Sequence, residues 1–180
     1  DYELANSKSL TKLKDGFQSI NFNFKDVNGE FISLNDKQFK NKVVVVQILG
    51  TWCPNCLDET QFFLSYIEEN PTQDLAFVGL SVEAAKTEER AMKRISSMIE
   101  KFDIPYPILL AQYGSTDKEI FLEKIPMLEN IISYPTTIII DKSGKVNSIH
   151  TGFNGPATGQ AFIDYKNEFE SEIKGLLKLQ

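Results

Sequence analysis

The sequence contains few of the residues that build metal centres and disulfide-rich folds. Its 180 residues include two cysteines, Cys53 and Cys56, and one histidine, His150. A structural zinc site needs four ligands, and His150 is far from the cysteines in the sequence. A disulfide-stapled secreted domain carries more cysteines, spread along the chain. We therefore expect neither class, and a zinc site shared across a dimer is the only zinc arrangement left open.

Long apolar runs and basic clusters are also missing. The longest apolar runs, 43–46 and 138–140, are far shorter than the roughly 20 residues that span a bilayer. Nineteen basic residues against twenty-five acidic ones give a net charge of −6, and basic residues gather only in pairs such as Lys93-Arg94. We expect no nucleic-acid partner, because nonspecific binding to phosphates needs a basic surface. Residues 1–10 show no secretory signal, which is uninformative in a chain that opens on Asp1.

The length and composition predict one globular domain. A chain of 180 residues with 42% hydrophobic and 24% charged residues buries enough surface to fold without staples. Residues 1–14 are interpreted as a loosely attached lead-in with one helical turn at 10–13, and residues 15–180 as the domain. We find no internal repeat or low-complexity tract.

The two cysteines lie between a predicted strand and a predicted helix. Residues 42–49 are nearly all apolar and β-branched, which is typical of a strand buried on both faces. Residues 57–69 carry apolar side chains at helical spacing. Pro54 suits the first turn of that helix, where its missing N–H has no partner to lose. The sequence Cys53-Pro54-Asn55-Cys56 is therefore expected at a helix N-terminus.

A helix N-terminus favours a thiolate over a thiol, because its free N–H groups carry partial positive charge. We therefore interpret Cys53 as a nucleophile and Cys56, one turn into the helix, as the resolving thiol. A structural disulfide closing so short a loop would stabilise the fold little. A peroxidatic cysteine lacks its usual upstream Pro and Thr, and a copper site would have only His150 as a further ligand. Redox chemistry is the favoured interpretation.

The remaining patterns predict an α/β fold. Strand patterns cover 18–24, 31–34, 75–82, 108–110, 133–141 and 145–150, and helix patterns cover 87–102, a short segment opened by a capping box at 116–119, and the segment after 159. Strands joined by helices indicate a parallel core, and the final hairpin adds antiparallel strands. Because chemistry gathers at the carboxyl ends of parallel strands, Glu83 is expected near Cys53.

Two motifs carry a resemblance to a known family. Trp52-Cys53-Pro54-Asn55-Cys56 follows an apolar strand, and Tyr134-Pro135-Thr136-Thr137 precedes another. Together with the Asn28-Gly29 turn, a βα insertion at 75–110 and the turn at 141–144, they resemble the thioredoxin superfamily, most closely its TlpA/ResA-like extracytoplasmic thiol-disulfide reductases. The resemblance implies a thioredoxin-like three-layer α/β/α sandwich with a mixed central sheet, an N-terminal β-hairpin and a βα insertion.

The resemblance also implies roles for individual residues. Pro135 is expected to be cis and to face the disulfide, and Glu83 to exchange a proton with Cys56. Gln47 departs from the pattern, because it stands where thioredoxin has a buried Asp. Phe153 is expected either to contact substrate or to plug the rim of the site. The expected substrate-binding residues are Trp52, Pro54, Asn55, Tyr134, Pro135 and Phe153.

The implied activity is reduction of protein disulfides with no organic cofactor and no metal. The expected partners are disulfide-bearing proteins and a separate electron donor, the chain itself acting as a monomer. The expected location is the periplasm or another extracytoplasmic space, with membrane attachment only through an anchor not seen in this sequence. Two alternatives stay open: a disulfide-forming oxidant, which Asn55 favours less than a histidine there would, and a non-enzymatic binding module or metallochaperone.

Overall fold

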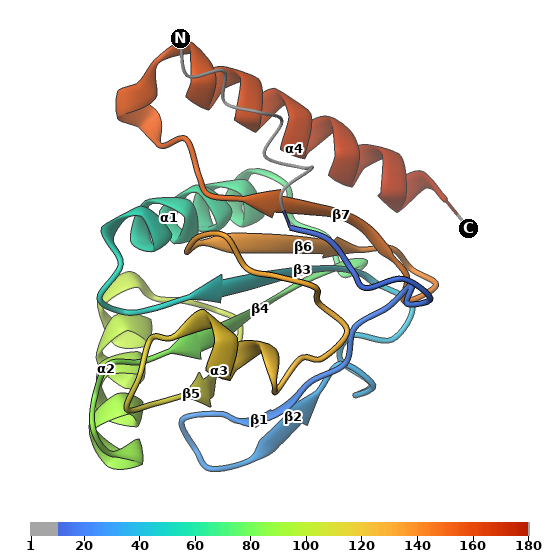
Figure 1. Cartoon of the computed structure of the whole chain (residues 1–180). Coiled ribbons are helices and arrows are strands. Elements are labelled where there is room, and N and C mark those ends of the chain that lie inside the picture. Colours follow the sequence, from blue (N-terminus) through green and yellow to red (C-terminus); the bar gives the residue numbers. More distant parts are fainter. Residues whose placement is uncertain (1–10, 180) are drawn as a thin grey trace, which may run out of the picture.

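Seven strands form one mixed sheet with helices packed on both sides (Figure 1). The structure is a computed structural model that describes residues 11–179. The strands are β1 (Asn23–Lys25), β2 (Phe31–Ser33), β3 (Val43–Leu49), β4 (Leu75–Val82), β5 (Ile108–Gln112), β6 (Thr136–Ile140) and β7 (Val146–Thr151). The helices are α1 (Pro54–Glu69), α2 (Glu88–Phe102), α3 (Lys118–Leu122) and α4 (Gln160–Lys178). The strand order in the sheet is β2-β1-β5-β4-β3-β6-β7.

Strand β3 is buried along its whole length, as its run of apolar residues predicts. It pairs in parallel with β4, in a register that runs from Val43 opposite Leu75 to Leu49 opposite Ser81. It pairs antiparallel with β6 on its other side. The predicted parallel core and antiparallel final hairpin are both confirmed.

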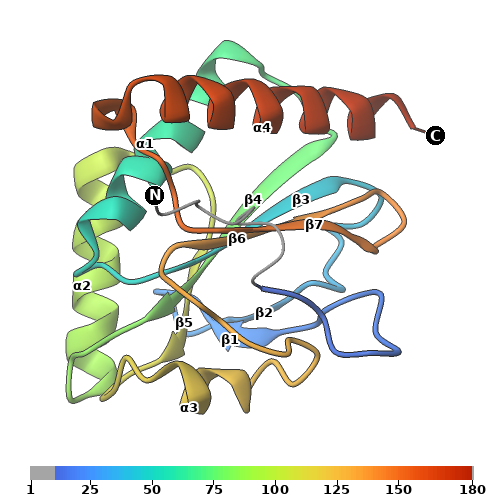
Figure 2. The ribbon, with the colours of Figure 1, turned by 45° about the horizontal axis from the view of Figure 1, so that its top comes forward.

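Alternate residues of β3 supply the two hydrophobic layers of the core. Val44, Val46 and Ile48 pack in the cluster that includes α3 residue Phe121. Val43 and Val45 pack instead against apolar residues of α1 and α4, listed with them as Phe62, Phe63, Tyr66, Tyr165 and Phe169. Figure 2 shows α1 and α4 on one side of the sheet and α3 on the other. This arrangement is the predicted three-layer α/β/α sandwich.

Both predicted hairpin turns are stabilised in the same way. In the turn between β1 and β2, Asp26 Oδ1 accepts hydrogen bonds from the backbone N–H groups of Asn28 and Glu30, at 2.8 and 2.9 Å. In the turn between β6 and β7, Asp141 Oδ1 accepts from the residues two and four positions later, at 2.8 and 3.0 Å. Each turn also holds a glycine at positive φ, +82° at Gly29 and +86° in the second turn.

Two local predictions differ from the structure in their boundaries. Residues 18–24 were expected to form a strand, but β1 begins only at Asn23. Ile20 and Phe22 are nevertheless buried, on the face that the alternation predicts. The N-cap of α3 is Asp117, whose Oδ1 accepts from Glu119 N at 2.9 Å, and the predicted capping box starting at Thr116 is therefore shifted by one residue.

Residues 11–14 pair with the segment that follows α3. Lys14 N donates to Met127 O and Glu129 N donates to Lys12 O, each at 2.9 Å, and Leu13 forms an antiparallel bridge with Leu128. The predicted helical turn is therefore not formed over 11–13, because these residues are extended beside another segment. Residues 1–10 of the predicted lead-in lie outside the described residues, and the domain boundary at 14/15 stays a prediction.

Within residues 11–179, no helix combines the length and the apolar character needed to cross a membrane.

Helix α4 is held mainly by aromatic packing, and Phe169 is at its centre. The Phe169 side chain is completely buried, and its ring lies 5.3 to 5.4 Å from the rings of Phe62, Phe63 and Tyr66 on α1. We predict that Phe169→Ala lowers the free energy of unfolding by about 3–5 kcal/mol, since it leaves a cavity between two helices. Urea denaturation measures this loss.

Ile163 on the same helix provides the matched control, because its side chain is 48% exposed. Ile163→Ala should change the free energy of unfolding by no more than about 0.5 kcal/mol. Equal losses in the two variants would show that α4 does not depend on the buried aromatic cluster.

Candidate active site

The cysteine pair lies where the fully buried strand β3 passes into helix α1. Cys53 is the N-cap of α1 and Pro54 occupies its first turn, as predicted. Cys53 and Cys56 form a disulfide, with their Cα atoms 5.3 Å apart. The hairpin of β6 and β7 and the end of β4 supply the surrounding residues.

The two cysteine residues differ slightly in their exposure to solvent. Cys53 is 6% exposed, whereas Cys56 is completely buried. Cys53 Sγ also accepts a hydrogen bond from the backbone N–H of Cys56 at 3.2 Å. A helix N-terminus that donates to one sulfur stabilises negative charge on that sulfur. Of the two sulfur atoms, Cys53 Sγ is therefore the one better suited to nucleophilic attack.

Trp52 forms an apolar surface next to Cys53. Its Nε1 donates to Val82 O at 2.8 Å, and its ring stands edge-on to that of Tyr134, with centroids 5.7 Å apart. The side chain is nevertheless 42% exposed. Gly50 permits this position, since a Cβ there would come within 2.3 Å of Trp52 Nε1.

The Tyr134–Pro135 peptide bond is cis, as the resemblance implied. Cys53 Sγ lies 3.8 Å from Tyr134 O, so this loop faces the disulfide. The Tyr134 hydroxyl donates to Thr116 O at 3.2 Å, and the N–H of Gly152 donates to Pro135 O at 2.8 Å. The loop is thus tied on both sides. At the start of α1, Pro54 is exposed and Asn55 is half-buried.

Glu83 is buried at the end of β4, and both its carboxylate oxygens accept hydrogen bonds. Oε1 accepts from Thr51 N at 2.9 Å and from Ser81 Oγ at 2.6 Å. Oε2 accepts from Thr51 Oγ1 at 2.7 Å. Glu83 therefore holds Thr51, the residue before Trp52, in place. It follows the carboxyl end of β4, as the sequence analysis expected.

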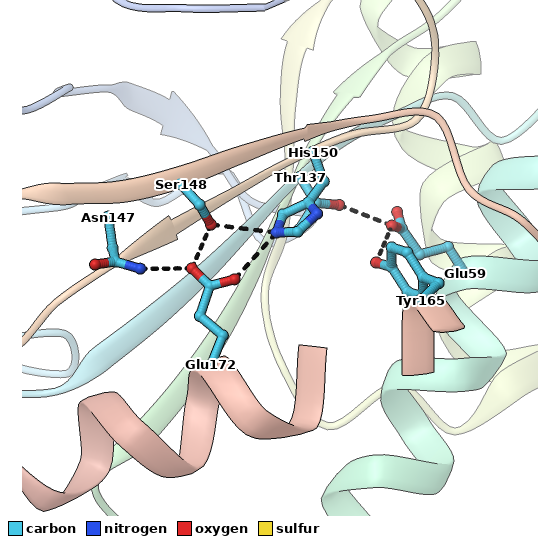
Figure 3. Close-up of polar contacts among 7 residues, drawn as sticks. All are labelled: Glu59, Thr137, Asn147, Ser148, His150, Tyr165 and Glu172. Carbon is cyan, nitrogen blue, oxygen red and sulfur yellow. Dashed lines mark hydrogen bonds and ion pairs between the residues drawn. The ribbon is translucent and has the colours of Figure 1, made fainter. Parts of the chain in front are cut away.

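A second buried carboxyl, Glu59, was missed by the sequence analysis. It lies on α1 one turn beyond Cys56, and its side chain is completely buried. Thr137 Oγ1 and Tyr165 OH donate to Glu59 Oε1, both at 2.9 Å (Figure 3). Burial raises the pKa of Glu59 to about 7, although hydrogen bonds from Gln47, Tyr165 and Thr137 lower it. This carboxyl therefore titrates near neutral pH.

Gln47 joins Glu59 to the active-site cysteine. Its Nε2 donates to Glu59 Oε2 at 2.9 Å and to the backbone carbonyl of Cys56 at 3.1 Å. Thr60 Oγ1 donates to Gln47 Oε1 at 3.0 Å and so fixes the orientation of the amide. The Gln47 amide, at the position where thioredoxin has a buried Asp, thus holds the Glu59 carboxyl of α1 by a hydrogen bond.

His150 belongs to a separate polar cluster between β7 and α4. Its Nε2 lies 3.1 Å from Glu172 Oε2, and Asn147 and Ser148 donate to Glu172 Oε1 (Figure 3). The hydrogen bonds of His150, Ser148 and Asn147 lower the pKa of Glu172 against the effect of burial. The cluster adjoins the Glu59 site, because His150 is the strand partner of Thr137 and its ring centroid lies 6.0 Å from that of Tyr165.

Phe153, a predicted substrate-binding residue, is buried in the aromatic cluster between α1 and α4. It is 7% exposed, and its ring packs 5.0 Å from Tyr165 and 5.9 Å from Phe62. Its expected role, contact with substrate or a plug at the rim of the site, stays a prediction.

Across residues 11–179, no three His, Cys, Asp or Glu side chains are grouped so that they could hold a metal ion.

The reason that Glu59 was missed lies in the orientation of α1. The helical spacing in the sequence predicts a buried face with Thr60, Phe63 and Ile67. The face that is buried in the structure also includes Cys56, Glu59 and Tyr66. A glutamate three residues after a buried cysteine was the available signal, since positions i and i+3 share a helix face.

Comparison with known proteins agrees with this fold. "Thioredoxin-like protein YneN" of Bacillus subtilis (strain 168) is 30% identical over 146 residues, covering 81% of this chain and 76% of that protein. "Thiol-disulfide oxidoreductase ResA" of the same organism is 25% identical and covers 86% and 75% of the two chains. A thiol:disulfide interchange protein of Chlorobium tepidum TLS has a similar structure, with a TM-score of 0.63 and 20% identity over 89% of this chain and 95% of its own.

The solved structure is similar enough to show a thioredoxin-like fold, and its low identity carries no more than that. The Redoxin family model matches residues 12–165, which hold the sheet, the cysteine pair and the cis-proline loop. This match, together with the 30% identity to a relative over most of both chains, shows that the chain belongs to the Redoxin family.

Proposed function

We propose that the chain is a thiol-disulfide oxidoreductase that reduces disulfides of protein substrates. The observation that carries the proposal is the Cys53–Cys56 disulfide at the N-terminus of α1, with Cys53 slightly exposed and Cys56 completely buried. A resolving thiol must be close to the nucleophile and shielded from the substrate, and this pair meets both conditions. The relatives named as thiol-disulfide oxidoreductases support the assignment.

The reaction transfers two electrons from the dithiol to the substrate. The Cys53 thiolate attacks one sulfur of the substrate disulfide, and the other substrate sulfur leaves as a thiolate that takes up a proton. The Cys56 thiol then loses its proton and attacks Cys53 Sγ. The second substrate thiolate leaves, and the Cys53–Cys56 disulfide is formed. A separate electron donor must reduce this disulfide before the next turnover.

Trp52, Pro54, Asn55, Tyr134 and Pro135 form the proposed substrate-binding surface. Tyr134 O, 3.8 Å from Cys53 Sγ, is placed to accept a hydrogen bond from an extended substrate segment. The exposed face of Trp52 offers an apolar contact beside the reacting sulfur. We further propose that the chain acts as a monomer in an extracytoplasmic compartment, where disulfide-bearing substrates are found.

Glu59 is the proposed acceptor of the Cys56 proton. It is buried one helical turn from Cys56 and is linked to the Cys56 carbonyl through Gln47. A carboxyl with a pKa of about 7 can accept a proton from a thiol and release it again near neutral pH. Glu83, whose oxygens all hold Thr51 and Ser81, is proposed as a positioning residue for the loop before the cysteines.

The direction of the reaction is tested by the midpoint potential of the Cys53–Cys56 pair. Equilibration in graded thiol buffers, followed by Trp52 fluorescence, should give a value below about −230 mV, in the range of reducing proteins. A value above about −150 mV would assign the chain as an oxidant. The absence of any reversible disulfide would contradict both assignments and favour a binding module.

The roles of the two cysteines are tested by trapping the intermediate. With a protein disulfide as substrate, Cys56→Ser should accumulate a mixed disulfide in close to equimolar amount, because nothing resolves it. Cys53→Ser should accumulate none. Non-reducing electrophoresis before and after dithiothreitol measures the complex, and trapping by Cys53→Ser instead would exchange the two roles.

The role of Glu59 is tested by the pH dependence of the reaction. The reductase rate should rise as the pH passes through about 7, where Glu59 loses its own proton. Glu59→Gln should remove this inflection and lower the rate at pH 8 by about tenfold or more. Glu83→Gln is the matched control and should keep the inflection; its loss in the Glu83 variant alone would move the proton-transfer role to that residue.

Stability gives an independent readout of the same titration. The pKa of Glu59 is higher in the folded chain than in the unfolded chain, so the folded state binds more protons between pH 4.5 and about 7. The associated stability is complete below pH 4.5 and is lost as the pH rises to about 7. Relative to Glu59→Gln, the wild-type protein should lose about 3 kcal/mol over this window, as measured by urea denaturation at each pH.

A further inference from the structure

A groove of about 980 Å³ opens between the cysteine loop and helix α2. Thr51, Trp52 and Leu57 form one wall, and α2 together with the residues just before it forms the other. Figures 1 and 2 both show α2 beside the start of α1. The groove reaches the cysteine loop at Trp52, the residue before Cys53. Trp52 belongs at once to this wall and to the proposed substrate-binding surface.

One face of α2 gives the groove its charge. Five lining residues are basic and exposed, namely Lys86, Arg90, Lys93, Arg94 and Lys101. Four of them lie on α2 at spacings that bring them to one side of the helix. In the sequence they are scattered over 16 positions, from 86 to 101, and only the pair at 93–94 is adjacent.

These cations have no acidic partner among residues 11–179. No ion pair includes any of the five, and no acidic side chain lines the groove. Glu88, at the start of α2, is engaged instead with Lys25 at 2.9 Å. A chain with a net charge of −6 thus concentrates positive charge in a groove that Trp52, the residue before Cys53, also lines. Like charges held together on a surface raise its attraction for an anionic partner.

Apolar side chains line the groove as well. Leu57, Met98 and Phe102 are among the lining residues, together with Trp52, which is 42% exposed. Lys101 Nζ lies 5.3 Å from the centre of the Phe102 ring, so even this cation borders an apolar surface. Apolar patches rimmed by charge are typical of protein interaction sites.

We propose that this groove binds an acidic, partly apolar segment of the disulfide-bearing substrate, next to the disulfide to be reduced. The inference rests on the proposed function and names the class of substrate. Carboxylates of the segment pair with Arg90, Arg94 and neighbouring lysines, while its apolar side chains contact Trp52 and Leu57. A concave site fits an extended polypeptide better than a flat lipid surface.

The test compares two synthetic peptides that contain the same disulfide. One carries Asp, Glu and Leu beside it, and the other carries Lys and Leu at the same positions. The wild-type protein should reduce the acidic peptide with a kcat/KM about tenfold higher than that of the basic peptide at low salt. This preference should shrink as added salt shortens the range of the charges.

The double variant Arg90→Glu/Arg94→Glu should abolish or reverse the preference between the peptides. Lys37→Glu/Lys40→Glu is the matched control, because it changes the charge equally in the loop before β3, at the opposite end of that strand from Cys53. Each kcat/KM is divided by that for bis(2-hydroxyethyl) disulfide, an uncharged substrate. This ratio removes any effect of the substitutions on the reactivity of Cys53 itself.

The outcomes separate the two proposals. Failure to reduce even the uncharged disulfide contradicts the proposed function, whereas reduction of both peptides at equal rates contradicts the groove alone. Two further measurements concern other occupants: cosedimentation with phosphatidylglycerol vesicles and dimerisation in sedimentation velocity. If the double variant abolishes either of these and leaves the peptide preference unchanged, the groove serves a membrane or a second copy and the proposal is overturned.

Discussion

The complete burial of strand β3 is the constraint on which the rest of the structure depends. With β4 on one side, β6 on the other and helices over both faces, none of its seven residues is exposed. Reactive groups can therefore meet solvent only beyond its carboxyl end, where the chain turns into α1. The cysteine pair, the cis-proline loop and the end of β4 converge at that edge because the register of β3 with β4 and β6 brings them there.

Polar groups beneath the disulfide are permitted because they satisfy one another. An unpaired buried carboxyl would be strongly destabilising, yet Glu59 accepts hydrogen bonds from three side chains that come from β3, β6 and α4. Its raised pKa keeps the carboxyl neutral over much of the acidic range, which lowers the desolvation cost further. Glu83 is also buried. It accepts hydrogen bonds from Thr51 and Ser81 and so holds the loop before the cysteines at the carboxyl end of β4.

Charge is distributed unevenly on this acidic chain. The basic side chains of α2 lie on one side of the helix, while α2 itself is fixed to the sheet by Ala91, Ile95 and Met98 on another. Packing of those apolar residues decides which way the cations point. The proposed groove is thus a consequence of how an ordinary amphipathic helix is seated beside the cysteine loop.

The sequence by itself determined the order of the strands and long helices and the place of the cysteine pair at a helix N-terminus, because these follow from local periodicity and from residues adjacent in the chain. It also placed Glu83 at the correct sheet edge, since strand ends are locally defined. Only the tertiary structure decided that Phe153 is buried, that Glu59 lies beneath Cys56 and that the cations of α2 line one groove. Each of these depends on how a helix or loop is rotated against the sheet, and that rotation is set by packing between residues distant in sequence.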